Sequence, residues 1–275
     1  MLLITNTRPV MSLTNSVIRR AVKRPPLAAK EAIWVFESNL TGRHARGVAA
    51  IAVKCLGAEE GKCSGVAGSS YAIPTRDGED KLLPWDDIEK HVRTFRSYAE
   101  AHPDQTFRIL PSPHGKSEQE HAHFADLFRN TPTNCELPGR WLELLKRLDT
   151  VRIILLDVNV TFLETERKRV LDQYFPVNEG LWNADNIEIV SLGSAQSLVA
   201  NDKYAKGRGY RHRIINVDPD FYGDYAEKVR EQLSVAYATK LICLNNPTAT
   251  STRKYVGAIH LASCAGLPID EVLIH

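Results

Sequence analysis

The sequence predicts an α/β protein of two domains, a smaller α/β unit over residues 31–148 and a doubly wound parallel sheet over residues 149–275. Three observations predict this fold class. Strand-length apolar stretches alternate with helix-length segments of periodic polarity along the chain. The stretch VRIILLDV at 151–158 is almost uninterruptedly apolar, as in parallel strands covered on both faces. The 275 residues are enough for two domains of ordinary size.

The first unit opens with a buried strand at 33–36, a turn rich in Gly, Ser, Asn and Thr at 38–42, and a small-residue helix at 45–52. Pro84 predicts the start of a helix that ends near Glu100. Apolar residues at helical spacing predict its buried face: Ile88, Val92, Phe95 and Ala99. The other predicted elements are a Gly/Ser-rich loop at 57–70, strands at 71–74, 107–110 and 135–137, and helices at 118–129 and 141–148.

The second unit repeats a strand–helix alternation, which with right-handed crossovers gives a doubly wound, Rossmann-like sheet. Its predicted strands are 151–158, 187–192, 213–217, 239–245 and 271–274. Its predicted helices are 163–175, 197–207, 222–235 and 252–265.

Residues 1–30 differ from the rest, because they contain basic residues and no Asp or Glu. Such an arm can follow phosphates or dock on an acidic partner, or it is a mobile terminus. A short helix is predicted at 12–23, and the apolar start is too short for a secretory signal.

The overall composition excludes several classes of protein. No apolar run reaches the roughly 18–20 residues of a membrane span, whereas a net charge of +2 argues neither for nor against a nucleic-acid partner. The cysteines are odd in number, widely spaced and without a C-x-x-C, which predicts neither a disulfide framework nor a zinc site and suits a reducing cytosol.

The strand–turn–helix at 33–53, IWVFESNLTGRHARGVAAIAV, carries the clearest functional pattern. A strand that leads through small residues into a helix start is a common anion site in α/β proteins. Arg43, His44 and Arg46 add positive charge there. The alternative is an ordinary connection with solvent-exposed basic residues.

Several short motifs follow this stretch: SNL at 38–40, GRH at 42–44, SYAIPT at 70–75, LP at 83–84 and HPD at 102–104. Through them residues 33–141 resemble a family encoded mainly by phages and prophages, whose layout is similar to a macro domain. Macro domains bind ADP-ribose and related nucleotides, and some hydrolyse them. The resemblance implies that Asn39, Gly42 and Gly47 lie beside the ribose or adenosine.

The chain departs from that family in its second Gly-rich loop. Where the family has G-C-G-L-A-G, this chain has PHGKSE at 113–118. Glycines let N–H groups approach a phosphate, whereas Pro113 removes a donor and Glu118 brings negative charge. Gly115 remains, and Lys116 and His114 are candidate cationic contacts or exposed loop residues.

Two small-residue turns mark the second unit, LGSAQSL at 192–198 and TATST at 248–252. Their layout resembles the SLOG nucleotide-binding superfamily, which includes DprA-like and lysine-decarboxylase-like proteins. The resemblance implies that Gly193, Ser194 and Ser197 contact a nucleotide phosphate. Thr250 and Ser251 are a second candidate site, with helix capping as the alternative.

No pattern in the sequence requires catalysis or a metal. The pair Asp86-Asp87 at a predicted helix start is interpreted as capping. Ser191 lacks a G-x-S-x-G motif, and Asp157 is either a ligand contact or a turn residue. His121 and His123 are two apart on one predicted helix and face different sides.

These observations and resemblances predict a nucleotide-binding protein of phage type. It would bind or sequester an NAD-derived, ADP-ribose-like or cyclic nucleotide and counter a host defence, in the bacterial cytoplasm or a virion. The prediction includes no cofactor and no membrane partner, and it allows a homo-oligomer. The alternative is a non-catalytic protein of a phage assembly with degenerate sites, docked to a phage or host protein through arm 1–30. A third hypothesis is an ADP-ribosyl hydrolase in which Asn39 orients the ribose and His44 or Asp77 is the acid–base.

Overall fold

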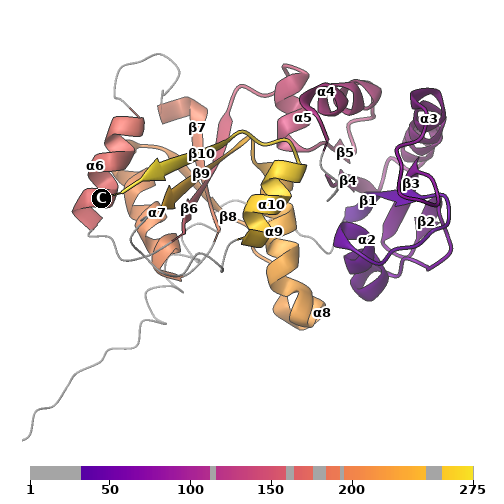
Figure 1. Cartoon of the computed structure of the whole chain (residues 1–275), viewed down its shortest axis with the longest axis horizontal. Helices are drawn as coiled ribbons and strands as arrows, with labels where there is room; N and C mark the ends of the chain where they lie inside the picture. Colours follow the sequence, from indigo (N-terminus) through magenta and orange to yellow (C-terminus); the bar gives the residue numbers. More distant parts are fainter. Residues whose placement is uncertain are drawn as a thin grey trace, which may run out of the picture.

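The computed structural model describes residues 32–111, 116–158, 164–175, 184–192, 195–245 and 256–274. Two mainly parallel β-sheets with helices on their faces form the molecule, so the predicted α/β fold class with two units is confirmed (Figure 1). The basic arm at 1–30, with its predicted helix, lies outside the described residues.

The first sheet has the strand order β2-β3-β1-β4-β5. Its strands are β1 (Ala32–Asn39), β2 (Gly65–Ala67), β3 (Ser70–Arg76), β4 (Thr106–Ile109) and β5 (Cys135–Glu136). All pair in parallel except β2, which is antiparallel to β3. Its helices are α2 (Gly47–Ile51), which continues as the π-helix η1 (Ala52–Leu56), α3 (Trp85–Ala101), α4 (Glu118–Leu127) and α5 (Gly139–Leu144).

The second sheet is wholly parallel, with the order β10-β9-β6-β7-β8. Its strands are β6 (Val151–Asp157), β7 (Ile187–Ser191), β8 (Arg211–Ile214), β9 (Lys240–Asn245) and β10 (Ile269–Leu273). The first strand is central and the chain reverses direction beside it, as in a Rossmann-like fold. Its helices are α6 (Glu164–Tyr174), η2 (Ala184–Asn186), α7 (Ala195–Arg208), α8 (Pro219–Tyr222), η3 (Gly223–Tyr225), α9 (Ala226–Tyr237) and α10 (Val256–Cys264).

The predicted core positions are confirmed. Ile88, Val92, Phe95 and Ala99 of α3 are buried, as are the four apolar residues at 153–156 in β6. Asp86 and Asp87 lie in the first turn of α3, but its N-cap is Pro84 and no side chain caps it. Asp87 pairs instead with Lys90.

One hydrophobic core is shared by the two sheets. It joins Trp34 and Phe36 of β1 to Ile154 and Leu156 of β6 through α2, α9 and α10. Helices α9 and α10 lie between the sheets (Figure 1). Gly139 starts α5 so close to α9 that a Cβ there would lie 2.3 Å from the Tyr237 carbonyl oxygen. Because the two units share this core, the predicted domain limits at 148 and 149 stay a prediction.

Several local predictions differ from the structure; the helix predicted at 141–148, for example, lies at Gly139–Leu144. The Gly/Ser-rich loop at 57–70 contains the edge strand β2, whose three residues are too few to give a sequence pattern. The strand predicted at 213–217 lies at Arg211–Ile214. The helix predicted at 222–235 is divided, because Gly223 (φ 49°) ends α8.

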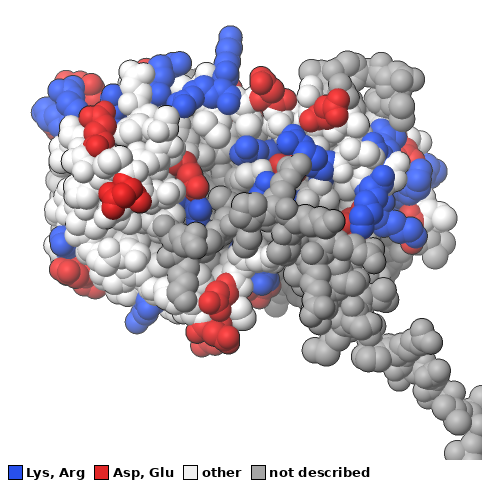
Figure 2. All heavy atoms as spheres, turned by 180° about the vertical axis from the view of Figure 1, so that it is seen from behind, with Lys and Arg blue, Asp and Glu red and all other residues white. Residues whose placement is uncertain are grey.

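The surface mixes charges of both signs. Acidic and basic side chains lie beside one another on the face seen in Figure 2. Among the described residues no helix is long and apolar enough to cross a membrane.

Candidate functional site

A small hollow of about 50 Å³, open to solvent, lies at the carboxyl ends of β1 and β4. Strand β1 lies between β3 and β4 in the sheet. The chain first adds β3 on one side of β1 and then crosses over to add β4 on the other side. Open α/β sheets bind ligands at such a reversal point, outside the carboxyl ends of the strands. We call this space the β1–β4 hollow; its lining includes Glu37, Asn39, Arg43, Arg46, Arg76, Asp80, Leu110 and Pro111.

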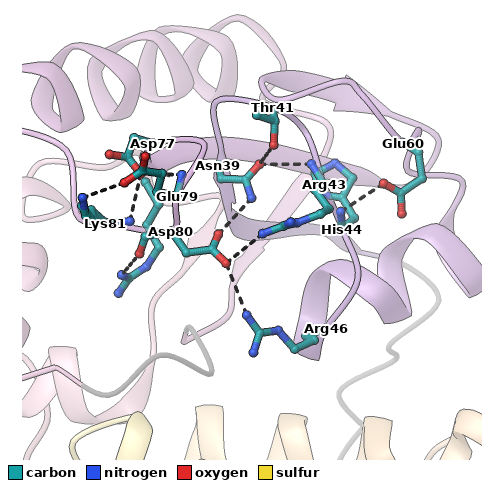
Figure 3. A network of polar contacts seen from close by, with 11 residues as sticks. Asn39, Thr41, Arg43, His44, Arg46, Glu60, Asp77, Glu79, Asp80 and Lys81 are labelled. Atoms are coloured by element: carbon teal, nitrogen blue, oxygen red, sulfur yellow. Dashed lines mark hydrogen bonds and ion pairs between the residues drawn. The ribbon is translucent and has the colours of Figure 1, made fainter.

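Two arginines, Arg43 and Arg46, contact the Asp80 carboxylate at the rim of the β1–β4 hollow (Figure 3), and a third, Arg76, holds the backbone of the same residue. Arg43 Nη2 and Arg46 Nη2 lie 3.2 and 3.3 Å from Asp80 Oδ2. Arg76 donates from Nη1 to the Asp80 backbone carbonyl at 2.7 Å. A hydrogen bond from Asn39, and then the charges of Arg43 and Arg46, lower the pKa of Asp80. Each guanidinium has five N–H donors. The single Asp80 carboxylate therefore leaves many donors of these arginines without a protein acceptor among the described residues.

Asn39, predicted to line a ribose, organises the loop in which it lies. Its Nδ2 donates to Asp80 Oδ1 at 3.0 Å, and its Oδ1 accepts from Thr41 Oγ1 at 2.8 Å and from the Arg43 backbone N–H at 3.1 Å (Figure 3). The amide therefore joins the end of β1 to the turn after β3. Its side chain also lines the β1–β4 hollow, so the predicted ligand contact stays a prediction.

The glycines of this loop are required by its path. Gly42 has φ 65°, and a Cβ there would lie 2.4 Å from the backbone carbonyl carbon of Gly61. Gly47 has φ 59° at the start of α2. Both are positions where residues with a Cβ are strained, so the positive φ accounts for both glycines, and close backbone packing adds a second reason at Gly42, with or without a ligand.

His44, the neighbour of Arg43, does not line the β1–β4 hollow. Its ring is buried edge-on to Phe36, and Nε2 lies 3.1 Å from the Lys62 carbonyl oxygen. Asp77, the other predicted acid–base residue, accepts from the backbone N–H groups of Glu79 and Lys81 and so closes its own turn. Both side chains therefore have local structural partners.

Lys116 is turned inward and paired with Glu37. Lys116 Nζ lies 2.7 Å from Glu37 Oε1 and 4.8 Å from the centre of the Phe124 ring. Thr75 Oγ1 donates to the other Glu37 oxygen at 3.0 Å. Burial raises the pKa of Glu37, but Lys116 and the hydrogen bonds outweigh it, so the pKa is lowered. Lys116 is thus not an exposed loop residue, although it is close to the β1–β4 hollow that Glu37 lines.

Part of the predicted phosphate sites cannot be placed. Gly115, Gly193, Ser194, Thr250 and Ser251 lie outside the described residues. Ser197 is described and lies buried in the first turn of α7.

Asp157 ends β6 at the carboxyl edge of the second sheet, where it was predicted to be a ligand contact or a turn residue. Its side chain is buried and accepts from Arg167 Nε at 3.0 Å. Arg167 also donates to the Asn201 side chain, and Asn201 Nδ2 reaches the Leu155 carbonyl oxygen at 3.0 Å. The carboxylate is therefore held by a cation that ties α6 and α7 to β6.

Ser191, His212 and Asp202 have the hydrogen-bond order of a Ser–His–Asp triad. Ser191 Oγ lies 2.7 Å from His212 Nε2, and His212 Nδ1 lies 3.2 Å from Asp202 Oδ1. Sequence reasoning missed this group because its members lie on three different elements, β7, α7 and β8, and triads are recognised by geometry. Ser191 is completely buried and also accepts from Asn201 Nδ2, so a substrate cannot reach the hydroxyl. The group is a buried polar network that joins β7, β8 and α7.

This network makes stability depend on pH. Burial lowers the pKa of His212 below its ordinary 6.5, against the opposing charge of Asp202. As pH falls below 6.5, the unfolded histidine takes up its proton before the folded one does, so the free energy of unfolding decreases. We expect urea unfolding to give lower stability at pH 5.5 than at pH 7.5. His212→Gln should reduce that dependence, and an unchanged slope in this variant would contradict the assignment.

The sequence missed two residues of the β1–β4 hollow, Arg76 and Asp80. Arg76 is the last residue of β3, the strand that pairs with β1, and Asp80 lies in the charged turn that follows. Asp80 has φ 64°, a left-handed conformation that Asp tolerates better than most residues. The position of this turn could have identified both residues, because the carboxyl ends of adjacent parallel strands lie at the same edge of a sheet. A turn after β3 is therefore expected beside the loop after β1.

Comparison with known proteins gives no assignment for this site. No protein-family model and no curated protein matches the chain. Among solved structures, formimidoylglutamase from Bacillus subtilis subsp. subtilis str. 168 aligns at 11% identity over 90% of this chain and 80% of that chain, with a TM-score of 0.23. A similarity this low carries no argument about fold or function, so the site has to be interpreted from its own geometry.

Proposed function

We propose that the protein binds a nucleotide-type ligand through its phosphate groups in the β1–β4 hollow. One observation carries the proposal: Arg43, Arg46 and Arg76 converge at the carboxyl edge of the first sheet. Guanidinium groups are suited to phosphates, because their planar N–H pairs match two phosphate oxygens.

The charge balance supports an anionic ligand. Glu37 is neutralised by Lys116, which leaves Asp80 as the carboxylate that pairs with Arg43 and Arg46, while Arg76 bonds only the Asp80 backbone. The side chains of Arg43 and Arg46 are 59% and 75% exposed, so their remaining donors are accessible. An incoming phosphate would share these donors with Asp80 or displace its carboxylate.

The other wall of the β1–β4 hollow supports a ligand with an apolar part. Val48, Ala49, Leu110 and Pro111 line it. A polar rim beside an apolar wall is typical of small-molecule sites. This combination fits a nucleoside phosphate better than a free inorganic anion.

The wider proposal follows the resemblances of the two units. A macro-like and a SLOG-like unit would both handle nucleotides, so we propose an NAD-derived, ADP-ribose-like or cyclic nucleotide as the ligand. A phage-type protein that sequesters such a molecule would counter a host defence that signals with it. Binding rather than hydrolysis is proposed, because His44 and Asp77 are engaged in local contacts.

A second candidate function is favoured by the same loops. The Glu37–Lys116 pair is buried beside the β1–β4 hollow, and Asp80 already occupies the arginines. Internal partners of this kind are expected of a degenerate site, in a structural or interaction protein of a phage assembly. Its predicted docking element is the arm at 1–30.

Thermal unfolding and calorimetry with ADP-ribose, NAD, AMP and a cyclic oligonucleotide separate the two functions. A ligand at about 100 times its dissociation constant should stabilise the folded protein by about 2.7 kcal/mol. Arg46→Met should weaken binding by about tenfold, the value of one charged hydrogen bond. Asp80→Asn should strengthen binding, because the competing negative charge is removed.

Arg93→Met is the matched control, because Arg93 is an exposed arginine on α3 paired with Glu89 outside the lining of the β1–β4 hollow. It should leave affinity unchanged. Asn39→Ala is a poor probe, since the amide holds the loop itself. If none of the four ligands binds at millimolar concentration, the nucleotide proposal fails and the interaction protein is favoured.

A further inference from the structure

A second cavity lies where the two units meet, between β4, β5 and α5 on one side and β6 and α9 on the other. Its volume is about 230 Å³, a little below the roughly 300–1,000 Å³ of drug-sized ligand sites, which suits a small ligand. The residues on which the inference rests are Arg108, Glu136, Leu142, Arg152, Leu233 and Tyr237. We call it the Arg108–Arg152 cavity; it shares no lining residue with the β1–β4 hollow.

Arg108 brings one guanidinium to this cavity. Its side chain is only 8% exposed, and its Nε donates to Glu136 Oε2 at 2.6 Å. Its Nη1 is buried with no hydrogen-bond partner among the described residues. Buried guanidinium nitrogens normally have partners, because an unmet donor loses the hydrogen bonds it makes in water.

Arg152 brings a second guanidinium, for which the described residues supply no carboxylate within ion-pair distance. Its Nη1 makes one long hydrogen bond of 3.4 Å to the Tyr237 carbonyl oxygen, and its Nε is buried without a partner. Its Cζ lies 4.1 Å from the centre of the Tyr237 ring, so the aromatic face holds the side chain in place. Burial lowers the pKa of Arg152, against the opposing influence of Tyr237 and Glu188.

The rest of the lining is apolar. Two guanidinium groups face one carboxylate, Glu136, and the other walls are formed by Ile109, Leu137, Leu142, Leu233 and Ala236. An oxyanion would pair with the Arg152 guanidinium, which has no carboxylate partner among the described residues, and with the Arg108 guanidinium that lines the same cavity, and an apolar body would cover the aliphatic wall. We propose that the Arg108–Arg152 cavity binds a small carboxylate or phosphate ester that carries an apolar group.

Such a ligand would contact both units, because Arg108 belongs to β4 and Arg152 to β6. Binding would therefore stabilise the junction between them as well as the local fold. The inference is independent of the nucleotide site, since it uses other residues and another cavity.

The test is calorimetric titration of the full chain with benzoate and phenyl phosphate, which combine an oxyanion with an apolar ring. Inorganic phosphate and benzyl alcohol each supply one half of that chemistry. We expect one site for benzoate or phenyl phosphate and at least tenfold weaker binding of the two partial probes. The stronger of the two ring compounds identifies the oxyanion as carboxylate or phosphate.

Arg152→Met should abolish this binding and leave the melting temperature without ligand unchanged or higher, because it removes a partly buried charge that has no ion-pair partner among the described residues. A purely structural Arg152 would instead give a lower melting temperature. Arg147→Met, an exposed arginine just after α5, is the control and should bind normally. Arg46→Met should also bind normally, which separates this site from the β1–β4 hollow.

Leu142→Trp provides a second variant that fills the cavity and leaves both arginines in place. It too should prevent binding. The proposal is overturned if neither ring compound binds at millimolar concentration, if Arg152→Met and Leu142→Trp both bind as the parent does, or if inorganic phosphate binds as tightly as phenyl phosphate.

Discussion

Replacing Lys116 by methionine is expected to lower the free energy of unfolding by about 3–5 kcal/mol, because the Glu37 carboxylate would remain buried without its cation. The Lys116 side chain is 2% exposed and that of Glu37 is 11% exposed, so water cannot easily replace the lost partner. Thr75 would still donate one hydrogen bond to Glu37. Urea unfolding at pH 7 measures the loss.

The double variant Glu37→Gln with Lys116→Met should recover most of that stability, because it removes both charges together. Lys90→Met is the control; Lys90 is 70% exposed and its pair with Asp87 is worth little. Equal losses in the single and double variants would mean that packing of the lysine, and not its charge, stabilises this region.

The same variants address the function. If the buried pair belongs to a degenerate site, removing both charges should have no effect on ligand affinity. If the Glu37 wall contributes to nucleotide binding, the double variant should change the affinity while Lys90→Met does not. ADP-ribose affinity and the free energy of unfolding can therefore be measured on the same variants, to test both the function and the stability of the buried pair.

Arg167→Met is expected to cause a loss of similar size, about 3–5 kcal/mol. Arg167 and Asp157 are 6% and 2% exposed, and the guanidinium also donates to Asn201, which is completely buried. Removing Arg167 leaves both a carboxylate and an amide oxygen without a partner, which costs more than a lost surface ion pair. Thermal and urea unfolding should agree on the size of the effect.

Arg169→Met, two residues along α6 and exposed, is the matched control and should change stability by no more than about 0.5 kcal/mol. Asp157→Asn combined with Arg167→Met should be more stable than Arg167→Met alone. A small effect of Arg167→Met would show that water reaches Asp157 at the carboxyl end of β6. That result would return Asp157 to the set of candidate ligand contacts.

The local patterns predicted most elements of the fold. The helical spacing of Ile88, Val92, Phe95 and Ala99 identified α3 and its buried face, and the apolar run at 153–156 identified β6 as a strand covered on both sides. Both signals come from residues close in sequence, whose periodicity reflects the local backbone. The alternation of strands and helices then predicted the fold class.

The sequence also pointed to the loop after β1, and it identified Arg43 and Arg46 as cationic candidates there. It did not identify Asp80, which both arginines contact, or the role of Asn39 in holding the loop. Asn39 and Asp80 are separated by 41 positions. The sign of the charge was predictable, but the partner that each arginine meets was not.

The sequence by itself determined the order and type of the elements, the buried faces of α3 and β6, and the basic character of the first loop. Only the tertiary structure decided which polar groups meet: Lys116 with Glu37 across 79 positions, and Ser191 with His212 across 21. It also decided that Arg108 and Arg152 face one cavity. The physical reason is that periodicity is set by neighbours along the chain, whereas hydrogen bonds and buried charges depend on strand order and packing between distant segments.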